Sequence, residues 1–216
     1  GGDAFRGYCI FKNGHSVGKS SLCILLDRMF GMTGLIIFLI LSLPLMFDLI
    51  SDNEIQWGVI VVVTSAFAII CLSLMLDLLP KKIAHFKVVK GLFAFSKEGR
   101  KQMFSIYPGV VLIAISMSIH LISIAAVIVL SKGMSLDFEW YSMLFVIPFT
   151  ILASAIPISI AGWGVRESVM IVSLGYLGIA PEQALVLSIL YGLIMLVVSI
   201  PGLVFWLRGK HSIGDK

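Results

Sequence analysis

Long apolar runs separated by short charged segments constrain this fold more than any other feature of the chain. The long runs are about 20 residues each, the length at which a helix crosses the ~30 Å hydrocarbon layer of a membrane. Backbone groups in lipid must find hydrogen-bond partners within their own segment, so such runs predict helices. We therefore predict an all-α integral membrane protein, a polytopic helical bundle with full spans at residues 29–50, 57–79, 107–130 and 183–207.

Composition and the placement of charge support this fold class and predict an orientation. The chain is 59% hydrophobic and only 13% charged, which excludes a soluble domain of this length. Seven lysines and arginines lie in residues 80–102, whereas Lys132 is the only one in segments 51–56 and 131–139. Because basic segments stay on the cytoplasmic side, we expect a multi-pass protein of the cell membrane with residues 1–28, a basic loop at 80–102 and the C-terminus in the cytoplasm.

Two shorter apolar pieces, residues 140–156 and 165–178, lie between the third and the last span. At 1.5 Å per residue they extend about 25 Å and about 20 Å, so neither comfortably crosses the membrane. The last span must begin outside the cell if it is to end in the cytoplasm. The start of the first piece and the end of the second must therefore both lie on the outer side of the membrane. The favoured arrangement is a re-entrant pair of broken helices around residues 157–167, and a turn at the cytoplasmic interface stays open as the alternative.

The turn between these pieces carries the strongest candidate for a functional site. The segment 157–167 contains a helix-breaking proline and two glycines, Gly162 and Gly164, which precede the pair Arg166 and Glu167. Glu167 suits the positive end of a helix that begins near Gly164, whereas Arg166 does not. An arginine beside the free N–H groups of a helix start can hold a phosphate. The alternative is an interfacial turn whose Arg166 and Glu167 meet water or headgroups.

Two N-terminal features add candidate residues. The pattern G-x-x-x-R occurs at residues 2–6, ending in Arg6 and including Asp3, and again at residues 162–166. Matching breaks in two halves are typical of transporters with inverted repeats, although five residues can also agree by chance. Asp27 and Arg28 form a second adjacent acid–base pair before the first predicted span. Their alternative role is a helix end at the headgroups.

Several chemistries are not expected. The segment 13–20 resembles a P-loop but places its first glycine one position too close to the second, and no strand pattern precedes it. No histidine has a second ligand at metal-binding spacing, so we expect no metal. We also expect no cofactor, no nucleic-acid partner and no enzyme activity. The three cysteines are interpreted as small apolar fillers. Ser116 and His120, four residues apart, are interpreted as groups that bond a neighbouring helix.

The chain resembles the flippase-like membrane domain of lysylphosphatidylglycerol synthases and of related stand-alone membrane proteins. The stretches that carry the resemblance extend over most of the sequence: residues 1–6, 26–31, 157–167 and 179–185. The resemblance implies a single flippase-like transmembrane domain over residues 1–216, preceded in relatives by further helices. Many relatives carry an arginine after the tyrosine that corresponds to Tyr191, where this chain has Gly192, so one polar contact is expected to be absent.

The resulting hypothesis is a flippase that moves an anionic phospholipid or a polyprenyl-phosphate-linked lipid between leaflets. Arg166 and Arg6 would bind the lipid phosphate, with Arg28, Gly162 and Gly164 in the same site. Glu167 and Asp3 would orient those arginines or compete for them. Two alternative functions are a non-catalytic subunit that recruits or regulates a lipid or cell-envelope biosynthetic enzyme, and an intramembrane enzyme that acts on a polyprenyl phosphate. For the quaternary state, a homo-oligomer is an open possibility.

Overall fold

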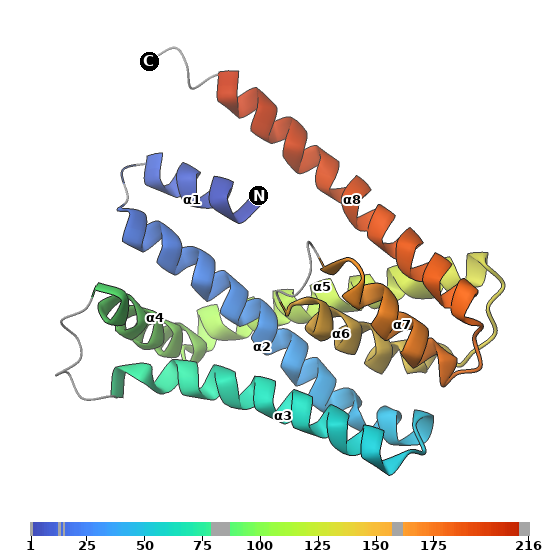
Figure 1. Cartoon of the computed structure of the whole chain (residues 1–216). Helices are drawn as coiled ribbons and strands as arrows, with labels where there is room; N and C mark the ends of the chain where they lie inside the picture. Colours follow the sequence, from blue (N-terminus) through green and yellow to red (C-terminus); the bar gives the residue numbers. More distant parts are fainter. Residues whose placement is uncertain (1, 13, 15, 79–86, 157–161, 212–216) are drawn as a thin grey trace. The chain divides into compact units, whose positions relative to one another are not determined.

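The computed structural model describes residues 2–12, 14, 16–78, 87–156 and 162–211, and in these residues every regular element is a helix (Figure 1). The α-helices are α1 (Gly2–Lys12), α2 (Val17–Leu49), α3 (Asn53–Met75), α4 (Lys87–Met103), α5 (Ile106–Gly133), α6 (Met143–Ser154), α7 (Val165–Gly175) and α8 (Pro181–His211). Two short 3-10 helices, η1 (Leu76–Leu78) and η3 (Trp140–Ser142), follow α3 and precede α6. The predicted all-α fold class is confirmed.

Four helical stretches in the described residues are long and apolar enough to cross a membrane, as predicted. They are Val17–Leu49, Asn53–Leu78, Ile106–Gly133 and Pro181–Gly202. By contrast, α6 has 12 residues and α7 has 11. At 1.5 Å per residue these two helices extend about 18 Å and about 17 Å, less than the ~30 Å of hydrocarbon. The chain is therefore a polytopic membrane protein with a pair of short helices before its last span.

The first span differs from the prediction because its helix begins twelve residues earlier than expected. Ser16 caps α2, since its hydroxyl accepts a hydrogen bond from the backbone N–H of Lys19. A serine at this position satisfies one of the free N–H groups of the first turn, so Ser16 of the segment that resembles a P-loop acts as a helix cap. Asp27 and Arg28 consequently lie inside α2, and the interpretation that they mark a helix end is wrong.

The basic segment at residues 80–102 lies between the second and third candidate spans. Its described part forms the 17-residue helix α4. The chain divides into two compact units, residues 1–121 and 122–216, and each is described by itself. The first contains α1 to α4 and the first part of α5, and the second contains the rest of α5 with α6, α7 and α8.

In the first unit, helices α2, α3 and α4 pack around a shared apolar cluster. Its buried members are Leu26, Met29, Phe30 and Leu74. Where α5 crosses α2, the Ser116 hydroxyl donates to the Gly31 carbonyl at 3.0 Å, and His120 Nε2 lies 3.4 Å from the same oxygen. These polar groups therefore bond a neighbouring helix, as the sequence predicted.

In the second unit, α7 packs against both α6 and α8 (Figure 1). Met170 and Leu174 of α7 and Leu187 of α8 are fully buried. This packing holds the start of α7, which carries the Arg166–Glu167 pair, beside the middle of α8. Residues 157–161, which lead from the end of α6 to Gly162, lie outside the described part of the chain.

Candidate functional site

Two glycines shape the turn that leads into α7. Gly162 and Gly164 have φ values of +77° and +86°, in the left-handed region that other residues rarely adopt. A Cβ added to Gly162 would also lie 3.0 Å from the Cβ of Ser154 at the end of α6. The next helix begins at Val165, where the sequence predicted it to begin. Pro157 and the four residues after it lie outside the described residues.

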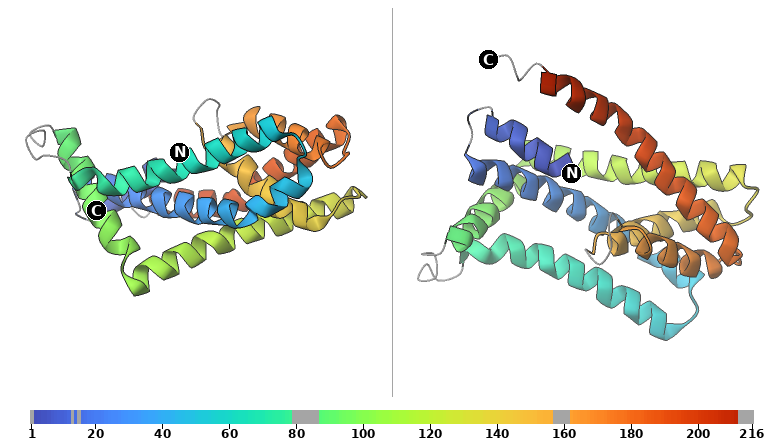
Figure 2. Two further views of the ribbon diagram at one scale, coloured as in Figure 1. Left: turned by 90° about the horizontal axis from the view of Figure 1, so that it is seen from below. Right: turned by 45° about the horizontal axis from the view of Figure 1, so that its top comes forward.

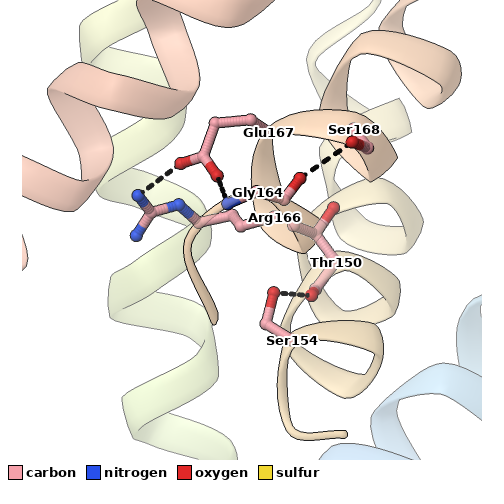
Figure 3. A network of polar contacts seen from close by, with 6 residues as sticks. All are labelled: Thr150, Ser154, Gly164, Arg166, Glu167 and Ser168. Carbon is pink, nitrogen blue, oxygen red and sulfur yellow. Dashed lines mark hydrogen bonds and ion pairs between the residues drawn. The ribbon is translucent and has the colours of Figure 1, made fainter. Parts of the chain in front are cut away.

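Glu167 ties the first turn of α7 to this bend (Figure 3). Its Oε2 accepts a hydrogen bond from the backbone N–H of Gly164, and its Oε1 accepts one from Arg166 Nη2 at 2.7 Å. The Ser168 hydroxyl donates to the Gly164 carbonyl at 2.8 Å. The Glu167 side chain is only 12% exposed. Its role at the helix start is thus accounted for by capping and by the favourable end of the helix dipole.

Arg166 is not accounted for in the same way. Its side chain is 11% exposed although it lies in the first turn, where a positive charge opposes the helix dipole. Its Cζ lies 5.2 Å from the centre of the Trp163 ring, a cation–π distance. Its Nε is buried and has no hydrogen-bond partner in the described part of the chain. A largely buried arginine with a donor that has no partner in the described residues is an expensive arrangement, and it suits a group that receives an anion.

Gly192 of α8 makes room for the guanidinium. A Cβ added to Gly192 would lie 2.8 Å from both Cζ and Nη1 of Arg166, closer than such atoms approach in proteins. The missing side chain thus lets Arg166 lie directly against the α8 backbone. From the sequence, Gly192 was expected only to remove a polar contact. The signal that could have indicated this role is a glycine inside the apolar span 183–207, where it weakens the helix unless something approaches closely.

The N-terminal candidates lie in the other unit and are described separately. Arg6 of α1 forms an ion pair with Asp27 of α2, with 2.9 Å between Nη1 and Oδ2, and both side chains are exposed. The Asp3 side chain lies outside the described residues, so its predicted role toward Arg6 stays a prediction. Arg28 follows Asp27 on α2 and is exposed. From the sequence, Asp27 was matched with Arg28 only because the two are adjacent. In the structure, Asp27 pairs with Arg6.

The described residues show no group of three or more His, Cys, Asp or Glu side chains that could hold a metal ion. Cys9, Cys23 and Cys71 are free thiols. At the start of α7 the site presents a guanidinium with a carboxylate on one of its nitrogens, and a guanidinium is a group that binds anions.

Removing the carboxylate of Glu167 is expected to destabilise the fold. Glu167→Ala should lower the free energy of unfolding by about 3 kcal/mol, since it leaves a buried arginine unpaired and the Gly164 N–H without its acceptor. Glu167→Gln keeps an oxygen for that N–H and should cost less. Unfolding of the purified protein in detergent, followed by circular dichroism, measures this. Glu182→Ala, which removes an exposed glutamate from the first turn of α8, is the control, and an equal loss in both alanine variants would contradict the prediction.

A family model described as the lysylphosphatidylglycerol synthase TM region matches residues 1–202 of the chain. The matched range includes the four candidate spans and the turn that carries Arg166. Comparison with curated proteins and comparison with solved structures each gave no match.

Proposed function

Since the chain belongs to the family of lysylphosphatidylglycerol synthase transmembrane regions, we propose that it is a flippase that moves a phosphate-bearing lipid between the two leaflets of the cell membrane. The family agrees with the resemblance drawn from the sequence and associates the chain with membrane lipid. The proposal adds the activity, transbilayer movement, and the group that is recognised, the lipid phosphate. This phosphate is common to anionic phospholipids and to polyprenyl-phosphate-linked lipids.

The observation that carries the proposal is the largely buried guanidinium of Arg166, whose Nε has no hydrogen-bond partner among the described residues. Nε and Nη2 form one edge of the planar guanidinium, and arginine commonly binds phosphate through two nitrogens of one edge. Here Glu167 occupies only Nη2, at 2.7 Å, and Nε has no partner in the described residues. Ionisable groups within a membrane protein are costly and most often mark a substrate path. A second oxygen, from a lipid phosphate, would complete this edge.

Glu167 supports the release of lipid in this scheme. An arriving phosphate would take the Nε–Nη2 edge and displace the Glu167 Oε1 atom, while Oε2 keeps its bond to the Gly164 N–H. When lipid leaves, Glu167 would again cover Nη2, so the guanidinium is never left without a counter-charge. This exchange keeps binding weak enough for turnover, as a transport site requires.

The scheme requires neither a nucleotide nor a covalent intermediate. The sequence has no complete P-loop and no nucleophile-elbow serine, so we propose a non-enzymatic transporter that works passively or with an ion gradient. We further propose that α4 and the C-terminus face the cytoplasm, because the basic residues gather there. An unequal charge distribution of this kind sets the orientation of polytopic proteins.

Reconstitution tests the proposed activity. Purified protein in phosphatidylcholine vesicles is expected to accelerate the transbilayer movement of a fluorescent phosphatidylglycerol by about tenfold or more over protein-free vesicles, measured by dithionite bleaching of the outer leaflet. A fluorescent polyprenyl phosphate in parallel vesicles separates the two lipid classes. Protein that accelerates neither lipid would contradict the proposal and favour the partner-subunit alternative.

A further inference from the structure

Helix α4 connects two candidate membrane spans, so a membrane that they cross would have α4 at its surface. The candidate span Asn53–Leu78 precedes it, and only Phe104 and Ser105 separate it from the candidate span Ile106–Gly133. This last connection is tight: a Cβ added to Gly109 would lie 2.7 Å from the Gln102 carbonyl oxygen at the end of α4. Figure 2 shows α4 turned away from the direction of α5 and running across α2 and α3. The helix therefore ends within two residues of a membrane entry point.

One face of α4 is anchored to the first unit. Phe95 and Met103 pack on the apolar cluster of α2 and α3. A Cβ added to Gly99 would lie 3.2 Å from side-chain atoms of Leu74 and Met29, so the helix approaches its neighbours closely there.

Polar contacts lock the same face. Arg100 Nη2 forms an ion pair with Asp77 Oδ2 at 2.5 Å, and the Ser96 hydroxyl donates to Asp77 Oδ1 at 2.8 Å. With Asp77 positioned just after α3, these contacts fix which side of α4 points away from the protein.

The opposite face of α4 carries a stripe of lysines. Lys90, Lys97 and Lys101 are exposed, and their spacings of seven and four residues bring them to one side of a helix with 3.6 residues per turn. None of the three has an acidic partner within 4.0 Å in the described part of the chain. The acid closest to them on the helix, Glu98, accepts a hydrogen bond from Gln102 at 3.0 Å. The stripe thus presents three uncompensated positive charges.

We propose that this lysine stripe binds the anionic headgroups of the leaflet at which α4 lies. The charges are complementary, and basic side chains near an anionic membrane surface each contribute to such binding. Aromatic side chains just beyond α4 support the location: Phe104, in the linker, and Tyr107, in the first turn of α5, are 76% and 82% exposed, and aromatic side chains gather at the membrane–water interface. The proposal is independent of lipid movement and of Arg166.

A local probe on the stripe tests this proposal in the full chain. Ala94 is exposed on the same side of α4, so Ala94→Cys, with the three native cysteines replaced by serine, accepts a bimane label. The protein is reconstituted in phosphatidylcholine vesicles that contain headgroup-nitroxide phosphatidylglycerol or headgroup-nitroxide phosphatidylcholine. We expect the anionic quencher to act about fivefold more strongly, and to lose this advantage at about 1 M salt, where the Debye length is ~3 Å.

Variants decide whether the stripe is responsible. Lys90→Gln/Lys97→Gln/Lys101→Gln should bring the two quenching constants to within about twofold of each other, and the corresponding triple arginine variant should preserve the difference, because charge is what the headgroups sense. Lys12→Gln/Lys19→Gln/Lys132→Gln removes the same net charge elsewhere and should leave the difference intact. Equal quenching by both lipids in the protein with its native lysines, as an acidic protein partner would produce, would overturn the proposal. An equal loss of the difference in the control triple variant would also overturn it.

Discussion

Replacing Arg166 with alanine is expected to lower protein-dependent transbilayer movement of phosphatidylglycerol by at least about tenfold. The guanidinium supplies the two-nitrogen edge proposed to bind phosphate, and hydrogen bonds to charged groups are worth about 1.5–3 kcal/mol each. Arg166→Lys should be nearly as defective, since an ammonium offers no planar fork and no Nε beside the phosphate. Dithionite bleaching in matched vesicles measures the rate, and mass spectrometry of co-purified lipids should show a parallel loss of bound lipid.

Two controls separate lost binding from lost folding. Arg166→Ala leaves Glu167 buried without its partner, so Arg166→Ala/Glu167→Gln, which removes the orphaned charge, should fold better and still fail to transport. Lys132→Ala changes an exposed cation at the end of α5 and should transport at the unmodified rate. An Arg166→Ala protein that moves lipid normally would remove Arg166 from the site and leave the mechanism without its central group.

Adding a single methyl group at Gly192 is expected to lower the transport rate by about tenfold without unfolding the protein. The new Cβ would meet the far end of the flexible Arg166 side chain, at 2.8 Å from Cζ and Nη1, and not the backbone of another helix. The guanidinium must therefore shift, and catalytic or binding geometry is sensitive to displacements of about 1 Å. Alanine is also the better helix former by ~1 kcal/mol, so the thermal unfolding temperature should not fall sharply.

A matched glycine and a double-mutant cycle make this prediction specific. Gly202 lies in the same helix, and no described atom would lie within 4 Å of a Cβ added there, so Gly202→Ala should transport normally. In the Arg166→Ala background, Gly192→Ala should have no further effect, because the group that it displaces is absent. Independent effects of the two substitutions would show that Gly192 does not act through Arg166.

Much of the fold could be predicted because the membrane restricts which segments of a chain can cross it. Hydrocarbon thickness and the need for internal backbone hydrogen bonds make apolar run length decisive, and the four spans follow from it. The start of α2 was predicted twelve residues late because polar residues such as Asp27 look like a span boundary. The helix extends past them to its N-cap at Ser16, and Asp27 lies within it, where it forms an exposed ion pair with Arg6 of α1.

The contacts within the first turn of α7 could be predicted from the sequence, whereas the contacts between different helices could not. Gly164 and Glu167 follow from helix-capping rules, which operate within four residues. The contact between Arg166 and Gly192 joins residues of different helices, so no local rule links them. The direction of the lysine stripe on α4 likewise depends on which face Asp77 and the α2–α3 cluster hold.

The sequence by itself determined that this chain is a helical membrane protein and that Arg166 is a costly charge at a helix start. Burial in lipid and helix capping each act within one segment of the chain. The length of an apolar run therefore predicts the first, and the order of residues at a helix start predicts the second. Only the tertiary structure decided that the guanidinium of Arg166 rests against the α8 backbone at Gly192, with no partner for Nε in the part of the chain that the structure describes. That arrangement depends on how α7 packs against α8, and close packing between helices is a property of the folded chain alone.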